Sequence, residues 1–321
     1  MATPNLSEII TTTLTNRSGK IADNVTKNNA LLTWLKKEGN QRTVSGGRSI
    51  IEELSFAENG NGGWYSGYDV LPMAPQDVLS SAEYSFKQYA VPVVISGLEQ
   101  LQNSGKEAII DLMEARLKVA ESTMANAISQ GLYSDGTGAG GKQLTGLDAA
   151  VPVTPNTGVY GGIDRAVWAF WRPQVLDMPA VATTSTIQPA MNSLWTSLVR
   201  GSDRPNLIVA GTNIYATYLN SLQAFQRFTD SSEASLGFPS IKFMTVDVVL
   251  DGAIGGFSGA DTMYFLNTKY LHYRPHKDRN MVPLEPGRRT SFNQDASAQI
   301  LAWAGNLTCS GAQFQGRLIG S

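Results

Sequence analysis

The spacing of apolar positions predicts two helices in the first half of the chain. Apolar residues recur every three to four positions from Ser18 to Gly39 and again from Ser104 to Gly131, which is the spacing of one buried helix face. The second segment has about 26 helical residues and would be roughly 39 Å long, whereas an average helix has about 11 to 12 residues. We interpret it as a structural spine whose apolar stripe, rich in Met, lies in the core.

Residues 48–57 and 82–95 have the pattern of β-strands. The connection between them has over twenty residues, many of them Gly or aromatic, so the pattern predicts a long hairpin with an irregular tip. Connections of more than about 15 residues are uncommon in compact domains and usually functional. Because such a tip cannot bury Trp64, Tyr65 and Tyr68 by itself, we expect these rings to anchor another chain. The alternative is that they fold back on their own domain.

Beyond about residue 150 the pattern mixes helices and strands. Helices are predicted at 188–199 and 212–222, and strands at 206–210, 246–250, 263–273 and 298–308. The 321 residues contain no internal repeat and no low-complexity segment. A chain of this length buries a full core and commonly forms two lobes. We therefore predict an α+β protein whose second lobe is α/β.

The composition is poor in charge and rich in uncharged polar side chains. Charged residues make up 16% of the chain, where about 25% is usual, and Ser, Thr, Asn and Gln number 87. Such side chains lose their hydration at lower cost than ions do, so this surface suits contact with other protein more than long-range electrostatic steering. The charge is also unevenly distributed, since the first fifty residues carry a net +4 and the remainder about −6.

The basic first segment contains the amphipathic helix predicted from Ser18 to Gly39. In one interpretation this helix is solvated and packs on its own chain. In the other, it belongs to a basic arm whose apolar stripe packs on a neighbouring subunit. The second interpretation adds Leu31, Leu35, Lys36 and Lys37 to the interface residues predicted in the hairpin tip.

Several classes of protein are excluded. Cys309 is the only cysteine, which rules out a disulfide scaffold and predicts a buried, inert thiol. The first residues lack the basic start and apolar core of a secretory signal, and no apolar run approaches the 18 residues of a membrane span. We expect a soluble protein of intracellular origin without a membrane partner.

One glycine-rich segment matches nucleotide-binding spacings but lacks their context. Residues 136–142 fit both GxxxxGK and GxGxxG. A phosphate-binding loop joins a strand to a helix and has Ser or Thr after its Lys. Here the segment follows the predicted spine helix, and Gln143 occupies the Ser or Thr position. A turn that leaves the helix is the better interpretation.

The histidines and paired carboxylates do not form a recognisable catalytic or metal site. His272 and His276 are the only histidines, and Pro275 lies between them in a strand-like pattern, which argues against two ligands on one helix face. Neither histidine lies in a serine-triad motif. Glu52 and Glu53 alternate faces of a predicted strand and so do not converge. We expect no catalytic residue, no metal site and no cofactor.

A basic stretch at 272–279, followed by Arg288 and Arg289, interleaves aromatic and basic residues. Such a stretch allows weak contact with phosphate. The pI of about 5.8 lacks the strong basic bias of a dedicated nucleic-acid-binding protein, so sequence-specific recognition is not indicated.

The predicted elements follow a characteristic order: a basic arm, a long hairpin with an irregular tip, a spine helix, a Gly-rich turn, an α/β lobe and returning strands. The segments that mark this order are 21–39 (IADNVTKNNALLTWLKKEG), 49–71 (SIIEELSFAENGNGGWYSGYDVL), 132–147 (LYSDGTGAGGKQLTGL) and 291–307 (SFNQDASAQILAWAGNL). In this order the chain resembles, over nearly its whole length, the major capsid proteins of tailed bacteriophages. Each segment is moderately specific alone, and their order and spacing carry the resemblance.

The resemblance implies the Hong Kong ninety-seven-like capsid fold. On that mapping residues 1–45 form the N-terminal arm, 46–97 the extended loop, 98–150 and 265–321 the peripheral domain with the spine helix, and 151–264 the axial domain. Some members carry a long scaffolding segment before the arm. Only some fifty residues precede the hairpin here, so we expect a separate scaffolding protein. No lysine and asparagine pair matches the covalent cross-link of some members.

The implied function is that of a major capsid protein, which is not an enzyme. It would self-assemble into the hexamers and pentamers of an icosahedral head, located in the virion and, during assembly, in the host cytoplasm. The implied partners are a scaffolding protein, a portal, a decoration or cement protein, and packaged double-stranded DNA in weak non-specific contact. Two alternatives remain open: an encapsulin-like compartment shell, and a nucleotide-binding enzyme that uses the loop at 136–142.

Overall fold

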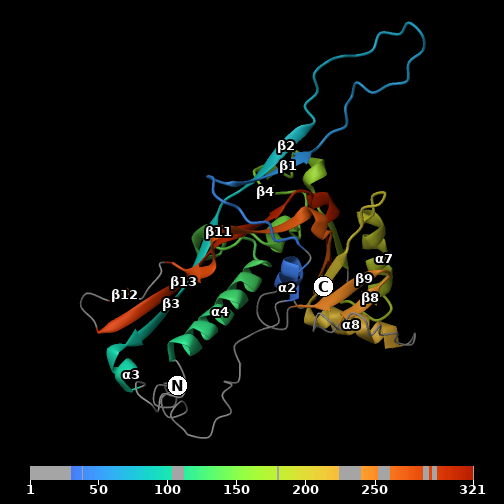
Figure 1. Ribbon diagram of the computed structural model, residues 1–321. Coiled ribbons are helices and arrows are strands. Elements are labelled where there is room, and N and C mark those ends of the chain that lie inside the picture. Colours follow the sequence, from blue (N-terminus) through green and yellow to red (C-terminus); the bar gives the residue numbers. More distant parts are fainter. Residues whose placement is uncertain are drawn as a thin grey trace.

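The computed structural model describes residues 30–37, 39–102, 112–178, 181–223, 240–251, 261–284, 289–290 and 295–320. Two larger sheets form the body, and a thin hairpin projects from it (Figure 1). Most of the predicted arm (residues 1–29) and the start of the predicted spine helix (103–111) lie outside the described residues. No helix among the described residues is long and apolar enough to cross a membrane.

The second half of the chain builds a six-stranded sheet. Its strands lie in the order β6 (Gln174–Met178), β14 (Gly316–Gly320), β10 (Thr262–Leu266), β7 (Leu207–Ala210), β9 (Val246–Leu250) and β8 (Ser240–Phe243). Helices α7 (Ile187–Leu198) and α8 (Thr212–Gln223) share one buried cluster with one face of this sheet. The predicted helices at 188–199 and 212–222, and the predicted strands at 206–210 and 246–250, are confirmed.

Both faces of this sheet are buried, which explains the unbroken apolar runs of β7 and β10. Ile208 and Phe265 pack in the cluster that contains α7 and α8, whereas Val209 and Tyr264 pack in the main core on the other face. Successive side chains of a strand point to opposite faces. A strand covered on both sides therefore shows continuous apolar residues in place of alternation.

The longer sheet is centred on β13 (Ala296–Cys309). This strand pairs with β3 (Lys87–Ser96), β11 (Leu271–Pro283) and β12 (Arg289–Thr290), always antiparallel. Helix α4 (Leu112–Gly131) packs against β3 and buries Ala120, Met124 and Ile128. The part of the predicted spine helix that the structure describes is thus confirmed, as is the predicted strand at 298–308.

The outer edge of β3 is closed to further strand pairing by two features. Gly97 N donates to Asp295 O at 2.9 Å, and the hydrogen bonds of an antiparallel pair recur at every second residue. The odd-numbered residues of β3 therefore direct their N–H and C=O groups to β13, and the even-numbered residues direct theirs to the outer edge. Pro92 occupies an outward position and has no N–H to offer. Arg116 Nη1 donates to the outward carbonyl of Val94 at 2.8 Å. A blocked edge does not recruit other strands unspecifically.

Two predicted strands are divided in the structure. The predicted strand at 263–273 is β10 and β11, which belong to different sheets and are separated by a 3-10 turn at Thr268–Tyr270. Asn267 initiates this turn, because its side chain accepts a hydrogen bond from Lys269 N at 3.2 Å. The turn contains neither Gly nor Pro, so the sequence pattern continued through it.

The predicted hairpin strand at 82–95 is also divided. Its first part belongs to β2 (Leu79–Tyr84), which pairs with β1 (Ile50–Ser55) from Ile50↔Tyr84 to Ser55↔Leu79. The remainder is β3, which leaves the hairpin and pairs with β13. Asn306 Nδ2 donates to Ser85 O, at 2.8 Å, where the chain changes partner. The hairpin is therefore shorter than predicted and is continuous at its base with the longer sheet.

The remaining elements are short. They are α2 (Ala30–Lys37), α3 (Gly97–Gln102), α5 (Gly138–Gly141), α6 (Leu147–Ala150), β4 (Val159–Tyr160), β5 (Ile163–Asp164) and 3-10 turns at Ala169–Trp171 and Ala312–Phe314. The last strand, β14, pairs with β6 and β10 in the six-stranded sheet. Residues 316–320 therefore do not group with α4, as the sequence mapping had placed them.

Candidate assembly surface

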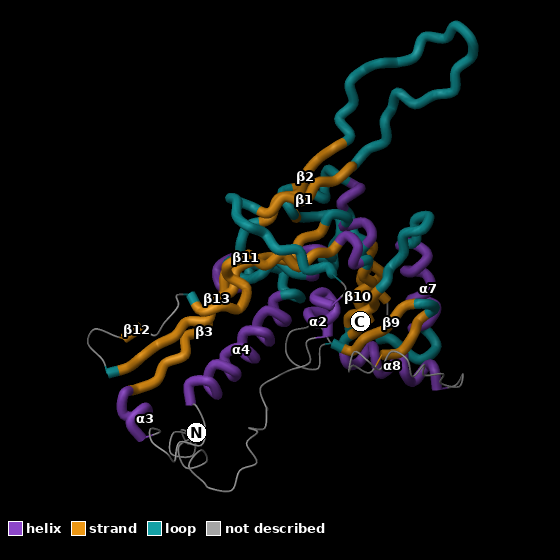
Figure 2. Tube along the Cα trace, viewed as in Figure 1, coloured by secondary structure: helices purple, strands orange, loops and turns teal. Residues whose placement is uncertain are grey.

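The connection between β1 and β2 projects far from the body, and we call residues 57–78 the loop tip (Figure 2). Trp64 and Tyr68 are fully exposed, at 106% and 105%, and Tyr65 is 68% exposed. The rings do not fold back on their own domain. The tip also exposes apolar side chains that the sequence prediction left out: Val70, Leu71 and Met73.

Local turns set the shape of the loop tip. Asn61 Nδ2 donates to Ala74 O at 2.5 Å, which joins the two sides of the tip. Ser66 N donates to Asp69 Oδ2 at 2.8 Å, and Asp69 N donates back to Ser66 O at 3.1 Å. These bonds satisfy polar groups but leave the aromatic rings in water. Contiguous exposed apolar groups of this kind mark interaction surfaces.

A buried ion pair fixes the root of the hairpin. Glu52, on the inward face of β1, is 7% exposed. Its Oε1 accepts hydrogen bonds from Arg274 Nε at 2.7 Å and Thr308 Oγ1 at 2.7 Å, and lies 2.6 Å from Arg274 Nη2. Glu53 faces outward, which confirms the predicted alternation. The ion pair ties β1 to β11 and β13, so the projecting loop starts from a rigid base.

A second buried contact ties β2 to the same base. Tyr84 Oη donates to Cys309 O at 2.7 Å and accepts from Cys309 N at 3.3 Å. The Tyr84 ring packs edge-on against Tyr160 with centroids 5.3 Å apart. Burial raises the pKa of the Cys309 thiol to about 12. The thiol therefore stays protonated, as predicted for a buried and inert cysteine.

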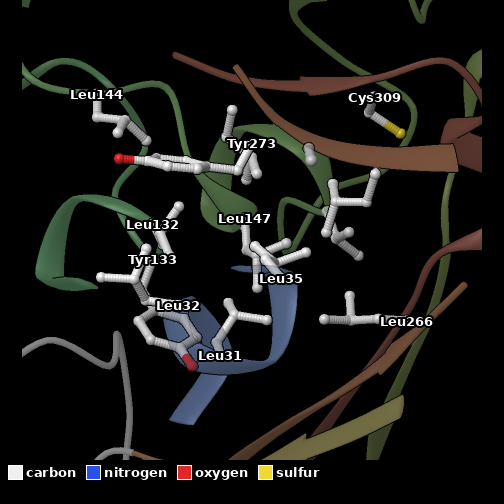
Figure 3. Close-up of a cluster of buried hydrophobic side chains, with 14 of the residues drawn as sticks. Leu31, Leu32, Leu35, Leu132, Tyr133, Leu144, Leu147, Leu266, Tyr273 and Cys309 are labelled. Carbon is white, nitrogen blue, oxygen red and sulfur yellow. The ribbon is translucent and has the colours of Figure 1, made fainter. Parts of the chain in front are cut away.

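The apolar face of helix α2 packs into the chain's own core (Figure 3). Leu31 and Leu35 are 1% and 0% exposed, packed among residues of the α4 end and both sheets. The prediction that these two leucines contact a neighbouring subunit is therefore corrected. The apolar stripe of α2 fills the junction between the lobes of its own chain. Lys36 and Lys37 are exposed, and their role at an interface remains a prediction.

Asp251 connects three elements at this junction. Its Oδ2 accepts hydrogen bonds from Leu31 N at 2.9 Å and from Tyr133 Oη at 2.7 Å. Burial raises the pKa of the Asp251 carboxyl, an effect that the two hydrogen bonds oppose. No sequence pattern indicated this contact, because Asp251 is more than a hundred residues away from both partners in the chain. It joins α2 and the end of α4 to the end of β9.

A groove of about 600 Å³ separates the hairpin from the end of the six-stranded sheet. Glu53 and Phe56 line its hairpin side, and Arg200 and Phe314 line the opposite side. The Phe314 ring stacks on Tyr270 with centroids 4.4 Å apart.

The glycine-rich segment forms a turn after α4. Its Ala139 and Gly140 have left-handed backbones, with φ of 53° and 68°. Gly141 N donates to Thr137 O and Gln143 N donates to Gly138 O, so these N–H groups close the turn on itself. A phosphate-binding loop needs them free and aimed at an anion in front of a helix. The predicted turn is confirmed.

The two histidines lie on β11 and not on a helix. His272 is 4% exposed, and burial, the largest cause, lowers its pKa to about 4. His276 Nδ1 accepts a hydrogen bond from Asp278 N at 3.2 Å. Among the described residues, no group of three or more His, Cys, Asp or Glu side chains is placed to hold a metal ion.

No protein-family model matches the chain, and a search of curated proteins by sequence finds no match. Solved structures do match over nearly the whole length. The capsid of cyanophage A-1(L) aligns with a TM-score of 0.72 and 17% identity, covering 95% of this chain and 96% of that one. The capsid of the Myoviridae phage XM1 aligns with a TM-score of 0.59 and 14% identity, covering 100% and 99%.

An encapsulin is also similar. The SrpI encapsulin complex from Synechococcus elongatus PCC 7942 aligns with a TM-score of 0.60 and 10% identity, covering 100% of this chain and 96% of that one. The XM1 and encapsulin alignments cover 100% of this chain and so include both sheets, α4 and the projecting hairpin. The architecture and these matches together show that the chain has the Hong Kong ninety-seven-like fold of tailed-phage capsid proteins.

Proposed function

We propose that this chain is the major capsid protein of a tailed phage. It would self-assemble into the hexamers and pentamers of an icosahedral head that encloses double-stranded DNA. Similarity to phage capsids over the full chain supports the proposal. The observation that carries it is the loop tip, which holds fully exposed aromatic rings on a rigid base. A solitary molecule gains nothing from such a feature, whereas repeated copies bury it.

The first experiment is electron microscopy of the purified protein, alone and co-expressed with its neighbouring gene products. Closed icosahedral particles are the expected result. A monodisperse monomer at high protein concentration under both conditions would contradict the proposal. Particles formed only with the neighbouring products would indicate a separate scaffolding protein.

A second experiment tests the loop tip as an interface. Trp64→Ala is expected to lower the yield of particles strongly, because buried Trp residues at interfaces are worth about 2 to 4 kcal/mol. It is expected to leave the thermal unfolding of the unassembled chain unchanged, since Trp64 touches no core residue. Val181→Ala, at an exposed position outside the loop, is the control. Equal particle yields for the two variants would show that Trp64 is not an anchor.

The encapsulin-like shell is the second candidate, supported by the encapsulin match. The two functions differ in the content of the particles. Purified particles that carry enzyme cargo and no genome would favour the compartment. Particles that carry DNA, or that fill with DNA in the presence of a packaging motor, favour the phage head. The phage head is preferred because the cyanophage capsid has the higher TM-score.

We infer a structural role and no catalysis. The N–H groups of Gly136, Thr137 and Gly141 in the loop at 136–142 bond to neighbouring residues of the same turn, which speaks against the nucleotide-binding alternative. Nucleotide binding that is lost in Lys142→Ala would restore that alternative.

In the proposed head, residues 30–45 belong to the arm, 46–97 to the extended loop and 98–150 to the peripheral domain. Residues 151–264 form the axial domain together with β14, and 265–315 return to the peripheral domain. A portal, a decoration or cement protein and weakly bound DNA are the further proposed partners. The protein would lie in the virion, and in the host cytoplasm during assembly.

A further inference from the structure

The loop tip is acidic as well as aromatic. Residues 57–78 contain Glu58, Asp69 and Asp77 and no Lys, Arg or His. All three carboxylates are exposed. A surface with three negative charges and exposed rings is best matched by a surface that offers Lys or Arg, because these cations pair with carboxylates and also bind the faces of Trp and Tyr.

A surface of that kind lies along the outer edge of β11. Residues 40–44 run parallel to β11: Arg42 N donates to Tyr273 O at 3.0 Å, and Lys277 N donates to Val44 O at 2.9 Å. The pairing of β11 with β13 is interrupted between Pro275 and Asn280, so residues 276–279 bulge out of the ladder. This arrangement brings the segment that carries Arg42 beside the segment that carries Lys277.

We call Arg42, Arg48, Lys277 and Arg279 the cationic strip. All four side chains are exposed. Within the part of the chain that the structure describes, none of the four forms an ion pair, in contrast to Arg274 beside them, which is bound to Glu52. With Asp278, which lies between Lys277 and Arg279, the strip carries a net +3. The loop tip carries −3, so the two surfaces match in charge.

The loop tip cannot reach the strip of its own chain. The hairpin starts at the base fixed by Glu52 and Arg274 and points away from the body (Figure 1). Because the tip and the strip of one molecule cannot meet, they can pair only between two copies of the chain. Such a head-to-tail contact leaves a free tip at one end of the row and a free strip at the other, and it repeats until a ring closes.

We propose that the acidic loop tip of one subunit docks on the cationic strip of a neighbouring copy, with its aromatic rings over the Arg and Lys side chains. This proposal rests on the proposed function and adds the receiving surface to it. Opposite charge favours the correct pairing and speeds the encounter, while the rings supply the buried contact.

The test uses two charge-reversed chains. The tip-reversed chain carries Glu58→Lys, Asp69→Lys and Asp77→Lys. The strip-reversed chain carries Arg48→Glu, Lys277→Glu and Arg279→Glu. In each chain alone, tip and strip have the same sign. We expect the protein concentration required for assembly to rise at least about tenfold, because like charges at a contact repel. Thermal unfolding of the unassembled chains checks that both fold.

Mixing the two reversed chains is the decisive step. Each tip then meets a strip of opposite sign on the other chain, so the equimolar mixture is expected to form particles that neither chain forms alone. Assembly of the unmodified chain is also expected to weaken between about 100 mM and 500 mM salt, as the Debye length falls below about 5 Å. Arg204→Glu, an equal charge change at an exposed position outside the strip, is the control for Lys277→Glu.

The proposal is overturned if either reversed chain assembles like the unmodified chain, or if two folded reversed chains do not assemble when mixed. Both results would leave the proposed function intact. Failure of the unmodified chain to form any particle would instead count against the proposed function, and so the two failures can be told apart.

Discussion

The buried pair of Glu52 and Arg274 allows a quantitative prediction about the root of the hairpin. Glu52 is 7% exposed and accepts from Arg274 and Thr308 through one oxygen. Replacing it with Leu leaves the Arg274 guanidinium, whose side chain is 16% exposed, without its counter-charge. Removal of one partner from a buried ion pair costs about 3 to 5 kcal/mol. Since whole domains are stable by only about 5 to 15 kcal/mol, this is a large fraction of the total.

Urea unfolding of the unassembled chain measures the effect. Glu53→Leu is the matched control, because the neighbouring carboxylate faces solvent and exposed substitutions change stability by about 0.5 kcal/mol or less. The double variant Glu52→Leu with Arg274→Met is expected to recover most of the loss, because replacing both charges with apolar groups is often neutral. The reasoning is refuted if Glu52→Leu costs no more than Glu53→Leu, or if the double variant is less stable than Glu52→Leu alone.

Three further predictions concern the core and its pH dependence. Gly146→Ala places a Cβ in steric conflict with the backbone oxygen of Leu132 and is expected to cost about 1 to 3 kcal/mol of stability. Gly63→Ala, whose Cβ meets nothing within 4 Å, is expected to be neutral, and equal unfolding midpoints for the two variants would contradict this. Burial lowers the pKa of His272 from its ordinary value of 6.5 to about 4 in the folded chain. Between these pH values the unfolded chain binds one more proton than the folded chain, so up to about 3 kcal/mol of stability is lost as the pH falls from 6.5 to 4. His272→Gln should remove this part of the acid sensitivity, and an unchanged dependence of stability on pH would argue against it. The effect of Asp251 on the pH dependence of stability has the opposite sign. Burial raises the pKa of its carboxyl, so its contribution to stability is present in acid and is lost as the pH rises through the raised pKa. Asp251→Asn should therefore match or exceed the unmodified chain in stability at pH 7. Asp251→Ala leaves Leu31 N and Tyr133 Oη without their acceptor and should lose about 2 to 6 kcal/mol, at about 1 to 3 kcal/mol for each unpaired group. Similar losses in both variants, measured by denaturant unfolding, would contradict the account.

Sequence patterns located most of the regular elements and the projecting loop. The exposed rings of Trp64, Tyr65 and Tyr68 follow from a long Gly-rich connection, which offers no core in which to bury them. The resemblance to phage capsid proteins rested on the order of elements, and full-length matches to phage capsid structures confirm the fold. In each case the signal is local: periodicity, turn residues or the length of a connection.

Other features depended on contacts between distant segments. The apolar stripe of Leu31 and Leu35 fits a neighbouring subunit and its own core equally well, because periodicity identifies a buried face but not the surface that covers it. The same holds for the strand at 82–95, where β-propensity continues while the pairing partner changes from β1 to β13. The cationic strip, too, exists only because residues 40–44 pair with β11.

The sequence by itself thus determined the elements, the low charge of the surface and the place of the exposed aromatic rings, since these depend on side-chain chemistry and on neighbours within a few positions. The tertiary structure decided which faces are buried, which strands pair and where charges gather. Those properties depend on packing between residues more than two hundred positions apart, such as Glu52 with Arg274 and Thr308, and local propensity carries no information about such partners.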